Sequence, residues 1–536
     1  MVTPRVRPVG ERAFLLEVGT LDEVLPLHAS LTASRPDGVI DLVPAARTVL
    51  VRVDPRVLPA AAARSWALGA ATETRQATDA ATPPVELDIA YDGADLADTA
   101  RLLGVDAHEL ARRHAQAHWR VAFTGFAPGF GYLVSDDWTF DVPRLESPRT
   151  RVPAGSVGLA GVFSGAYPRE TPGGWRLIGT TAARLFDPDA PSPALLEPGA
   201  RVRFRPVPAR VSAESGDLAR TGRFAPDAPA FAGSPDLAEG ARRAAAGRSI
   251  RVVEAGLLTT VQDLGRAGAA SVGVAVSGAL DRGALRTANR LVGNSEGAAG
   301  LEVTMGGLRA VAEADLWVAV TGAWGTVRLD GREVDPYEAH EWRAGSELHL
   351  DWFAHGARGY VAVRGGLDAR VALGSRATDL LAGLGPAALR AGDVVGVRDD
   401  VAGPIPVAPA AGWGAPQDGE LALELAPGPR ADWFAPAALA TLYETVWTVS
   451  NHADRVGARL DGPELARVRS SELPSEGMVP GALQVPPSGR PTILLADGPV
   501  TGGYPVIAVV TDAGLDLVAQ ARPGTRIRFR HARPAG

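Results

Sequence analysis

The chain has 536 residues and a formal net charge of −7, which argues against nucleic acid or an anionic membrane surface as a partner. It has no cysteine, which excludes disulfides, thiolate nucleophiles and thiolate metal sites. It also has no lysine, since all 54 basic residues are arginine, and this excludes a Walker A loop, a pyridoxal Schiff base, a Ser-Lys amidase and a biotin attachment point on this chain.

Glycine and proline are abundant, with 62 and 43 residues, and strand-like segments such as VRVDPRV and GTRIRFR recur. This pattern predicts a mainly β fold with α+β parts and many turns. A chain of this length usually folds as several domains. No segment has the length and hydropathy of a membrane span, so we expect a cytoplasmic protein without a membrane partner.

Residues 1–84 predict a small α/β domain. The strand-like RTVLVRVDP at 47–55 is followed by the helical pattern LPAAAARSWALGAA. In the next unit, residues 85–208, the first part predicts two short helices. Asp95 and Asp106 are the expected N-caps of these helices, and Gly104 is the expected break between them. Strands and glycine turns are expected after them, up to the end of the unit.

The segment RVAFTGFAPGFGYL at 120–133 contains three glycines, but it lacks the Gly-Lys-[Ser/Thr] ending of a phosphate loop. It favours a structural turn that packs Phe126 and Phe130, or else a loop that offers backbone N–H groups to an anionic or amide ligand. Just before it, His114 and His118 lie four residues apart without the Glu of HExxH. One packed and one exposed histidine is the favoured interpretation.

Residues 209–249 predict a linker, because they are rich in Ala, Pro, Gly and Ser. The second unit, residues 250–536, predicts two β-rich lobes with a helix at about 278–292, capped by Ser277 and ended by Gly293. GLGPAA at 383–388 is rejected as a dinucleotide fingerprint because it carries a proline and does not follow a strand.

Three strings occur in the same order in both halves. VPAGS, GAYP and PGARVRFR end the first half, and VPPSG, GGYP and PGTRIRFR end the second. This internal echo predicts that the two halves end in related β-barrels.

Three glycine-rich clusters carry polar side chains, as small-molecule pockets and tight hairpins both do. They are GSVGLAGVFSGAYPRETPGGW at 155–175, TTVQDLGRAG at 259–268 with SGALDR at 277–282, and LADGPVTGGYP at 495–505. No Asp, Glu and His set has convincing metal-ligand spacing, so we expect no metal site.

Longer motifs in the sequence indicate a family resemblance. FTGFAPGFGYL, SPRTRVPAGSVGLAG and YPRETPGGWRLIGTT resemble the B-type component of the bacterial ATP-dependent 5-oxoprolinase, a family that includes a sporulation-kinase inhibitor. GLLTTVQDLGRAG, VSGALDRGALRTANRLVGNSEGAAGLEVT, GSRATDL, EGMVPGALQVPPSGRP and TGGYPVIAVV resemble its C-type component. Both are similar to the carboxyltransferase domain of urea carboxylase. The chain thus resembles a fusion of the B-type and C-type components.

The resemblance implies cyclophilin-like β-barrels in both halves, one of them at 85–208. It implies ATP as cofactor, no covalent biotin, and a separate A-type lactam-hydrolase protein as partner. The implied reaction is the opening of 5-oxoproline to glutamate. A homo-oligomer is left open.

The resemblance also implies site residues. The catalytic candidates are His114, Asp263 and Glu476. The candidates for substrate or anion binding are Arg149, Arg151, Ser156, Tyr167, Gln262, Arg266, Asp281, Arg282, Arg455, Gln484, Thr501 and Tyr504.

The chain departs from the family pattern at Phe163-Ser164, where Gln-Thr is common, and around Pro499 and Val506, where an amide and a lysine are common. Two alternatives therefore stay open beside the 5-oxoprolinase. One is a biotin-dependent carboxyltransferase that acts on urea or another amide with a carrier in trans. The other is a binding protein that regulates a histidine kinase.

Overall fold

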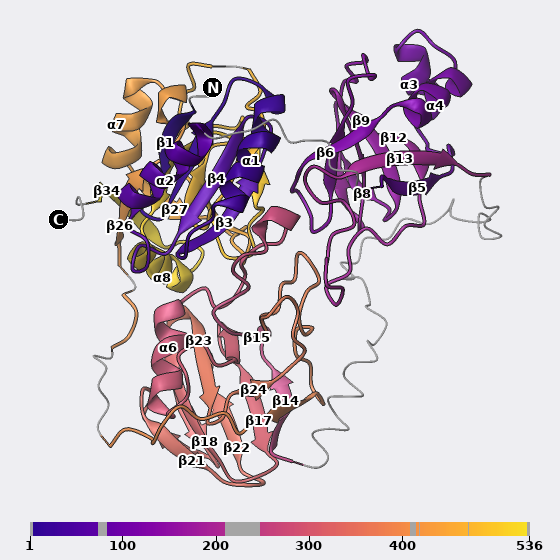
Figure 1. The fold of residues 1–536 in the computed structure, drawn as a ribbon. Helices are drawn as coiled ribbons and strands as arrows, with labels where there is room; N and C mark the ends of the chain where they lie inside the picture. The colour runs from indigo at the N-terminus through magenta and orange to yellow at the C-terminus, as the bar shows by residue number, and fades with distance from the viewer. Residues whose placement is uncertain are drawn as a thin grey trace, which may run out of the picture.

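The computed structural model describes residues 4–72, 83–208, 247–407, 414–417, 419–469 and 471–532. Four bodies are visible in Figure 1, which we call the N-terminal domain (4–72), the first barrel (85–206), the middle domain (249–397) and the second barrel (421–531). Most of the predicted linker lies outside the described residues. Strand β14 (Ser249–Ala255) begins at the last residue of that predicted range.

The N-terminal domain has a four-stranded antiparallel sheet in the order β1-β2-β4-β3, with both faces buried. Along β2, Phe14 and Leu16 pack beneath helices α1 and α2, whereas Leu15 packs against the second barrel. The domain therefore lies beside the C-terminal end of the chain, as Figure 1 shows. The elements are β1 (Arg5–Val9), β2 (Ala13–Glu17), α1 (Val24–Ala33), β3 (Val39–Pro44), β4 (Thr48–Val53) and α2 (Ala60–Thr72).

The first barrel is a seven-stranded sheet in the order β12-β9-β10-β7-β6-β13-β5. Its two ends meet at an antiparallel bridge between Ala90 and Thr180, with N–O distances of 2.9 and 2.8 Å, and this bridge closes the sheet. The strands of this sheet are β5 (Val85–Ile89), β6 (Trp119–Thr124), β7 (Gly131–Val134), β9 (Ser156–Ala160), β10 (Phe163–Ala166), β12 (Arg176–Thr180) and β13 (Arg201–Pro206). Beside it are α3 (Leu96–Leu102), α4 (Ala107–Gln116), β8 (Arg149–Val152) and β11 (Thr171–Gly173).

The second barrel is closed and, read from β33, runs β33-β30-β31-β28-β27-β34-β26. This is the strand order of the first barrel, with the same order along the chain and the same parallel pair, β26 with β34 matching β5 with β13. The strands are β26 (Leu421–Pro427), β27 (Val446–Val449), β28 (Gly457–Asp461), β30 (Ala482–Gln484), β31 (Thr492–Leu494), β33 (Val506–Val510) and β34 (Arg526–His531). Beside them are α7 (Pro436–Glu444), α8 (Asp512–Gln520), β29 (Glu476–Gly477) and β32 (Thr501–Gly502). The predictions of a mainly β fold and of related barrels in both halves are confirmed.

Only one of the three echoed strings occupies equivalent places in the two barrels. PGARVRFR and PGTRIRFR lead into β13 and β34, which have the same two neighbours in each sheet. VPAGS precedes β9 whereas VPPSG follows β30, and GAYP ends β10 whereas GGYP precedes β33. The alignment of those two strings was wrong, because short turn motifs recur wherever strands are linked tightly.

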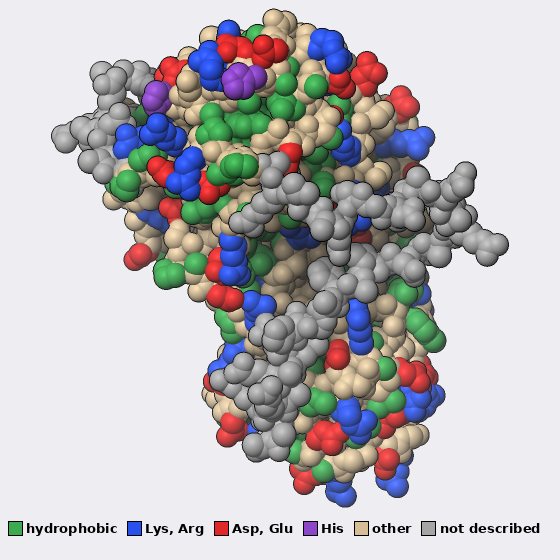
Figure 2. Space-filling view, turned by 90° about the vertical axis from the view of Figure 1, so that its right-hand side faces the viewer, with side chains coloured by type: hydrophobic (Ala, Val, Ile, Leu, Met, Phe, Trp, Pro, Cys, Tyr) green, Lys and Arg blue, Asp and Glu red, His purple; other side chains and the backbone are tan. Residues whose placement is uncertain are grey.

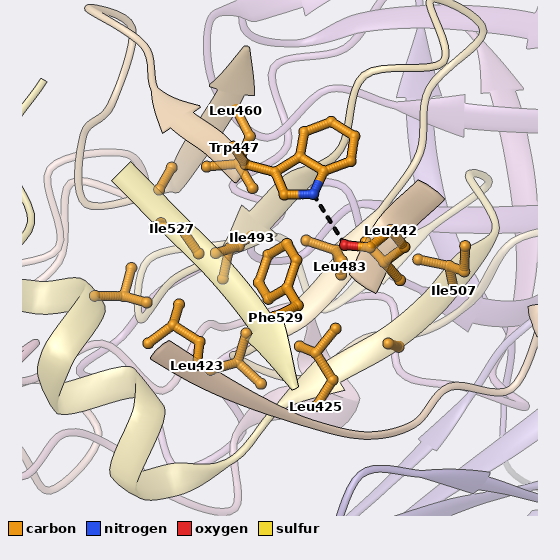
Figure 3. Packing of buried hydrophobic residues seen from close by; sticks show 14 of the residues in the cluster. Leu423, Leu425, Leu442, Trp447, Leu460, Leu483, Ile493, Ile507, Ile527 and Phe529 are labelled. Carbon is orange, nitrogen blue, oxygen red and sulfur yellow. Dashed lines mark hydrogen bonds between the residues drawn. The ribbon is translucent and has the colours of Figure 1, made fainter. Parts of the chain in front are cut away.

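The two barrel cores share a tryptophan hydrogen bond and a buried phenylalanine at equivalent places. The Trp447 indole N–H donates to the Leu442 carbonyl at 3.0 Å, as Figure 3 shows, and the Trp119 indole donates to the His114 carbonyl at 2.9 Å. Phe529 in β34 and Phe204 in β13 are both buried, and each of these strands pairs with the strand that carries the tryptophan. His114 therefore takes the core position that a leucine takes in the second barrel.

The middle domain packs two sheets around one core, with strand orders β20-β19-β22-β17-β14-β25-β24 and β15-β16-β23-β18-β21. Its further elements are β15 (Leu258–Gln262), η2 (Ala270–Val272), α6 (Arg282–Leu291), β16 (Gly300–Thr304), β17 (Leu308–Ala312), β18 (Leu316–Trp324), β19 (Val327–Leu329), β20 (Arg332–Val334), β21 (Ala339–Trp342), β22 (Glu347–Leu350), β23 (His355–Val363), β24 (Leu367–Asp368) and β25 (Val394–Val397). Figure 1 shows this domain below the other three bodies.

Helix boundaries follow the local caps. Asp106 caps α4 by accepting the Glu109 N–H at 2.7 Å, as predicted, and Gly104 has a φ of +72° at the break. The predicted start of α6 at Ser277 was wrong, because Asp281 caps the helix by accepting the Ala284 N–H at 2.8 Å. Within the described ranges, no helix is long and apolar enough to cross a membrane.

Candidate functional site

The glycine loop at 120–133 lies in an interface within the chain. Its Gly129 N–H donates to the Val272 carbonyl in η2 at 3.1 Å, and the Thr124 hydroxyl donates to the Ser271 carbonyl. On the other side of η2, the Ala270 N–H donates to Asp41 of the N-terminal domain at 3.3 Å. The glycines therefore let the first barrel approach the second half of the chain. We call the region around residues 262–278 and 372–385 of the middle domain, where the bodies meet, the junction.

Two buried polar side chains at the junction each have one atom without a partner. Gln262, at the end of β15, donates to the Thr378 carbonyl at 3.0 Å, but its Oε1 accepts no hydrogen bond among the described residues. Arg266 is 2 % exposed, and its guanidinium donates to the Ala372 and Ala377 carbonyls. The Arg266 Nη1 has no hydrogen-bond partner among the described residues. Unpaired buried donors and acceptors are costly and mark places where a ligand could pair.

Asp379 faces Arg266 without touching it. Its Oδ2 lies 3.9 Å from the Arg266 Nη1, too far for a hydrogen bond, and neither atom has another partner among the described residues. Its Oδ1 accepts the Ala382 N–H at 2.8 Å. Burial, and then the charge of Asp497, raise the pKa of Asp379 to about 6. This carboxyl can therefore take up or release a proton near neutral pH.

Asp497 and Arg455 bring the second barrel to the junction. Arg455 donates to Asp497 at 2.9 Å and to Glu302 of the middle domain at 2.5 Å. Burial alone would lower the pKa of Arg455, but these two carboxylates raise it overall. Ser277 completes the contact by donating to Asp497 Oδ1 at 2.6 Å. The network fixes the second barrel against the middle domain.

Two of the six non-glycine residues with a positive φ among the described residues lie at the junction. Ser277 and Leu373 both have a φ of +52°, a region that side-chain-bearing residues rarely adopt. Both lie beside Arg266, whose backbone N–H and side chain bond to the residues immediately before them, Val276 and Ala372. Strained residues cluster at functional sites, where the surrounding structure holds them.

Of the predicted site residues, the structure brings Gln262, Asp263, Arg266 and Arg455 to the junction. Asp263 has a turn-building role there, because it accepts from the Ser375 hydroxyl and the Arg376 N–H, both at 2.6 Å. Its two oxygens are occupied, so Asp379 is the better-placed carboxyl for proton transfer.

His114 lies away from the junction, in the core of the first barrel. It bonds to the Ser164 hydroxyl and the Tyr91 hydroxyl, both at 2.8 Å, and it is fully buried. Burial lowers the pKa of His114 to about 3, so the ring stays neutral. His118 is exposed beyond the end of α4, so the favoured interpretation of this histidine pair is confirmed.

Glu476 lies between the second barrel and the N-terminal domain. Arg430 pairs with it at both oxygens and also reaches Glu17 at 2.6 Å. Nearby, Gln484 contacts the Met478 sulfur at 3.7 Å. Thr501 abuts Gly125 of the glycine loop, and Tyr504 is half exposed.

The candidates of the first barrel form a separate group. Arg149 donates to Asp95 at 2.6 Å, and its Nη1 has no partner among the described residues. Arg151 pairs with Glu170 at the surface, at 2.6 Å. Ser156 is buried at the start of β9, and Tyr167 is buried beside it, where burial raises its pKa to about 12.

Asp281 and Arg282 lie at the start of α6, facing α8. The Gln520 amide donates to Asp281 at 2.7 Å, and the Arg282 N–H donates to Asp516 at 3.0 Å. Burial and then Asp516 raise the pKa of Asp281 to about 6, and burial lowers that of Arg282 to about 10. This group joins helix to helix rather than lining the junction.

Sequence reasoning missed Arg169, Ser277, Thr378 and Asp379 as site residues. GSRATDL and YPRETPGG were noticed as motifs, but no spacing relates them to Arg266. The available signal was a charged residue in each motif, Arg169 in YPRETPGG and Asp379 in GSRATDL.

Comparison with known protein families gives two matches in this chain. Residues 4–196 match the carboxyltransferase domain, subdomain C and D, and residues 272–531 match its subdomain A and B. The C-type component of the Escherichia coli 5-oxoprolinase is 38 % identical over 292 residues, covering 52 % of this chain and 90 % of that protein. The chain belongs to the carboxyltransferase-domain family of the 5-oxoprolinase B-type and C-type components.

Other members of the family agree with a fusion. The B-type component of the Escherichia coli 5-oxoprolinase is 46 % identical over 125 residues, which cover 23 % of this chain and 57 % of that protein. The crystal structure of TTHA0988 has a TM-score of 0.80 at 35 % identity and covers 97 % of this chain and 99 % of that one. Urea amidolyase of Saccharomyces cerevisiae is 30 % identical, but the match spans 16 % of that protein.

No group of three or more His, Cys, Asp or Glu side chains that could hold a metal ion occurs among the described residues. The polar atoms left without partners at the junction are an amide oxygen, a hydroxyl, a carboxylate oxygen and arginine nitrogens. Such a mixed set suits a small polar ligand that both donates and accepts hydrogen bonds.

Proposed function

We propose that this chain is the fused B-type and C-type component of an ATP-dependent 5-oxoprolinase, which opens 5-oxoproline to glutamate with a separate lactam-hydrolase protein. The observation that carries the proposal is that relatives named as these two components of 5-oxoprolinase match in one continuous chain. The junction supports it, because it lies where both halves contribute residues.

Opening a lactam requires only a few catalytic groups. A lactam is a resonance-stabilised amide, so opening it requires charge stabilisation at its oxygen and a base for the attacking water. ATP, consumed as a substrate, supplies the phosphoryl group that activates the lactam oxygen. A first water adds to the carbonyl carbon, the ring C–N bond breaks and the nitrogen takes a proton, which leaves glutamyl phosphate. A second water then cleaves this acyl phosphate and releases glutamate and inorganic phosphate.

The junction offers groups for these steps. The Arg266 Nη1 is a free donor for an oxyanion or a phosphate oxygen, and arginine suits both. The free Oδ2 of Asp379 can accept the proton of water and return it to the nitrogen. Arg455 and Asp497 hold the second barrel in place around them.

The test is reconstitution. The purified chain is mixed with a candidate lactam-hydrolase protein, 5-oxoproline and ATP, and both glutamate and ADP are measured over time. We expect glutamate and ADP to form only when both proteins are present. Background rates with a partner verified to bind the chain would contradict the proposal.

A carboxyltransferase that acts on urea or another amide is a second candidate, supported by the domain match and the urea amidolyase relative. It predicts transfer of carboxylate from a separately supplied biotinylated carrier to urea. Carbon-14 bicarbonate with a biotin carboxylase and carrier tests this directly, and it does not require 5-oxoproline. Regulation of a histidine kinase stays a prediction.

A further inference from the structure

Arg169 extends from the first barrel toward the middle domain. It lies between β10 and β11, and its Nη1 is 3.7 Å from the position that a Cβ on Gly383 would occupy. That Nη1 is buried and has no hydrogen-bond partner among the described residues. The adjacent Glu170 is already paired with Arg151 at 2.6 Å. Arg169 therefore forms no ion pair with an Asp or Glu side chain among the described residues.

The loop that Arg169 faces is held rigidly. Asp379 and Leu384 exchange backbone hydrogen bonds of 2.9 and 3.2 Å, and Asp379 Oδ1 caps the Ala382 N–H at 2.8 Å. Gly383 has a φ of +64°, and no side chain stands between its backbone and Arg169. The loop thus fixes the free oxygen of Asp379 and leaves room for the guanidinium of Arg169.

Arg266 approaches the same carboxyl from within the middle domain. Its Nη1 lies 3.9 Å from Asp379 Oδ2, so a gap separates the two unpaired atoms. Asp379 also exerts an electrostatic effect on Arg169, where burial lowers the pKa and this carboxyl raises it. Arg266 therefore lies opposite this carboxyl oxygen without bonding to it, and Arg169, from the first barrel, reaches the same loop at Gly383.

Arginine pairs with free N–H groups bind planar or tetrahedral oxyanions well, because the guanidinium fork matches carboxylate and phosphate oxygens. A ligand oxyanion between Arg169 and Arg266 would satisfy both buried donors. Figure 2 shows a waist in the surface above the lower lobe, with basic side chains along it.

We propose that Arg169 and Arg266 form a binding subsite for the oxyanion of a small ligand, a carboxylate or a phosphoryl group, that neither half of the chain possesses alone. The choice of the natural ligands, the carboxylate of 5-oxoproline or the phosphates of ATP, rests on the proposed function. The subsite also gives a physical reason for joining the two halves, since the fusion holds Arg169 beside the loop that carries Asp379 and Gly383.

The subsite is tested by calorimetric titration of the full chain with four probes. These are 5-oxoproline, 2-pyrrolidone (the same lactam without the carboxylate), ATP and inorganic phosphate. We expect Arg169→Gln and Arg266→Gln to weaken binding of the anionic probe at least ten-fold and to leave 2-pyrrolidone unchanged. Preference for 5-oxoproline over 2-pyrrolidone assigns the carboxylate, whereas binding of ATP and phosphate assigns the phosphoryl group.

Arg101→Gln is the matched control, because Arg101 in α3 belongs to the same body as Arg169 but is exposed and paired with Asp98 at 2.9 Å. It should bind every probe as the wild type does. Arg169→Lys, which keeps the charge but loses the fork, is measured too, so that a folding failure of Arg169→Gln does not end the test. Unchanged anion affinity in these Arg169 variants overturns the proposal, and so does a wild-type chain that binds none of the probes.

The two proposals fail separately. If reconstitution yields no glutamate but Arg169→Gln still loses anion binding, the 5-oxoprolinase assignment fails and the subsite stands. If the reconstituted enzyme is active and Arg169→Gln binds and turns over like the wild type, the subsite fails and the assignment stands.

Discussion

Gly125 and Thr501 touch across the interface between the two barrels. A Cβ placed on Gly125 would overlap the Thr501 hydroxyl oxygen, and Thr501 Cβ and Cγ2 would lie within 2.9 Å of it. Gly129, four residues on, bonds to η2 of the middle domain. The bare backbone of the glycine loop is thus used for contact between the halves of the chain.

Gly125→Ala should therefore destabilise the protein by about 1–3 kcal/mol, because the added methyl group overpacks a close contact. Gly69→Ala is the control, since Gly69 lies in α2 with nothing within 4 Å of the added methyl. That change should be neutral or stabilising, as glycine weakens a helix interior. Midpoints of thermal and urea unfolding measure both effects.

A compensating change separates overpacking from general disturbance. Thr501→Gly removes the side chain that the new methyl meets, so the double variant Gly125→Ala with Thr501→Gly should recover part of the lost stability. Additive losses in the double variant would show that the two residues do not interact.

His114 should make the protein acid-sensitive. Its folded-state pKa of about 3 lies below the ordinary value of 6.5, so only the unfolded chain takes up the proton as the pH falls below 6.5. The sign is destabilising on acidification, and the loss between pH 7 and pH 5 is about 2 kcal/mol. Urea unfolding at the two pH values measures it.

His114→Leu is the informative variant, because Leu442 takes the same place in the second barrel. It should lower stability by a constant amount, since Ser164 and Tyr91 lose their partner, but it should remove the extra loss at pH 5. An equal loss on acidification in wild type and variant would assign the pH dependence to other groups.

The barrels could be predicted from the sequence because PGARVRFR and PGTRIRFR carry their own structural signal. In each, apolar residues alternate with arginines, so a half-buried strand is expected, and a Pro-Gly turn precedes it. The outward arginines pair with nearby acids, as Arg205 does with Asp88 on the neighbouring parallel strand at 2.6 Å and Arg528 with Glu420 at 2.6 Å.

The junction could not be predicted in the same way. Arg169, Arg266 and Asp379 come from separate turns. The fold of the middle domain brings Arg266 opposite Asp379, and the packing of the first barrel brings Arg169 to Gly383 of the same loop. Ser277 was predicted as a helix cap because serine suits that position, but a buried bond to Asp497 holds it in a strained conformation instead. Long-range contacts of this kind leave no periodic pattern in the sequence.

Glu476→Ala should act on stability rather than on a chemical step. Arg430 would keep its buried charge with Glu17 as its remaining carboxylate partner, so the loss should stay below the cost of a fully unpaired buried charge, about 3–5 kcal/mol. Glu472→Ala, an exposed change four residues earlier, should leave the unfolding midpoint unchanged. A wild-type midpoint in Glu476→Ala combined with lost turnover would instead support the catalytic role that the resemblance implies.

Asp379→Asn should stabilise the protein at neutral pH. With a folded-state pKa of about 6 against an ordinary 3.8, the carboxyl contributes its full stability only below pH 3.8 and loses it as the pH rises through 6. The asparagine carries no charge and can still cap the Ala382 N–H, so its advantage should reach about 3 kcal/mol at pH 7.5 and shrink toward pH 4.5. Urea unfolding at both pH values measures that advantage.

The same variant should remove activity from the reconstituted enzyme. The wild-type pH–rate profile should show an acidic limb near pH 6, because Asp379 must be ionised to accept a proton. Asp379→Asn should lack turnover at every pH, since an amide cannot take the proton of the attacking water. A variant that stays active would assign the proton transfer to another group.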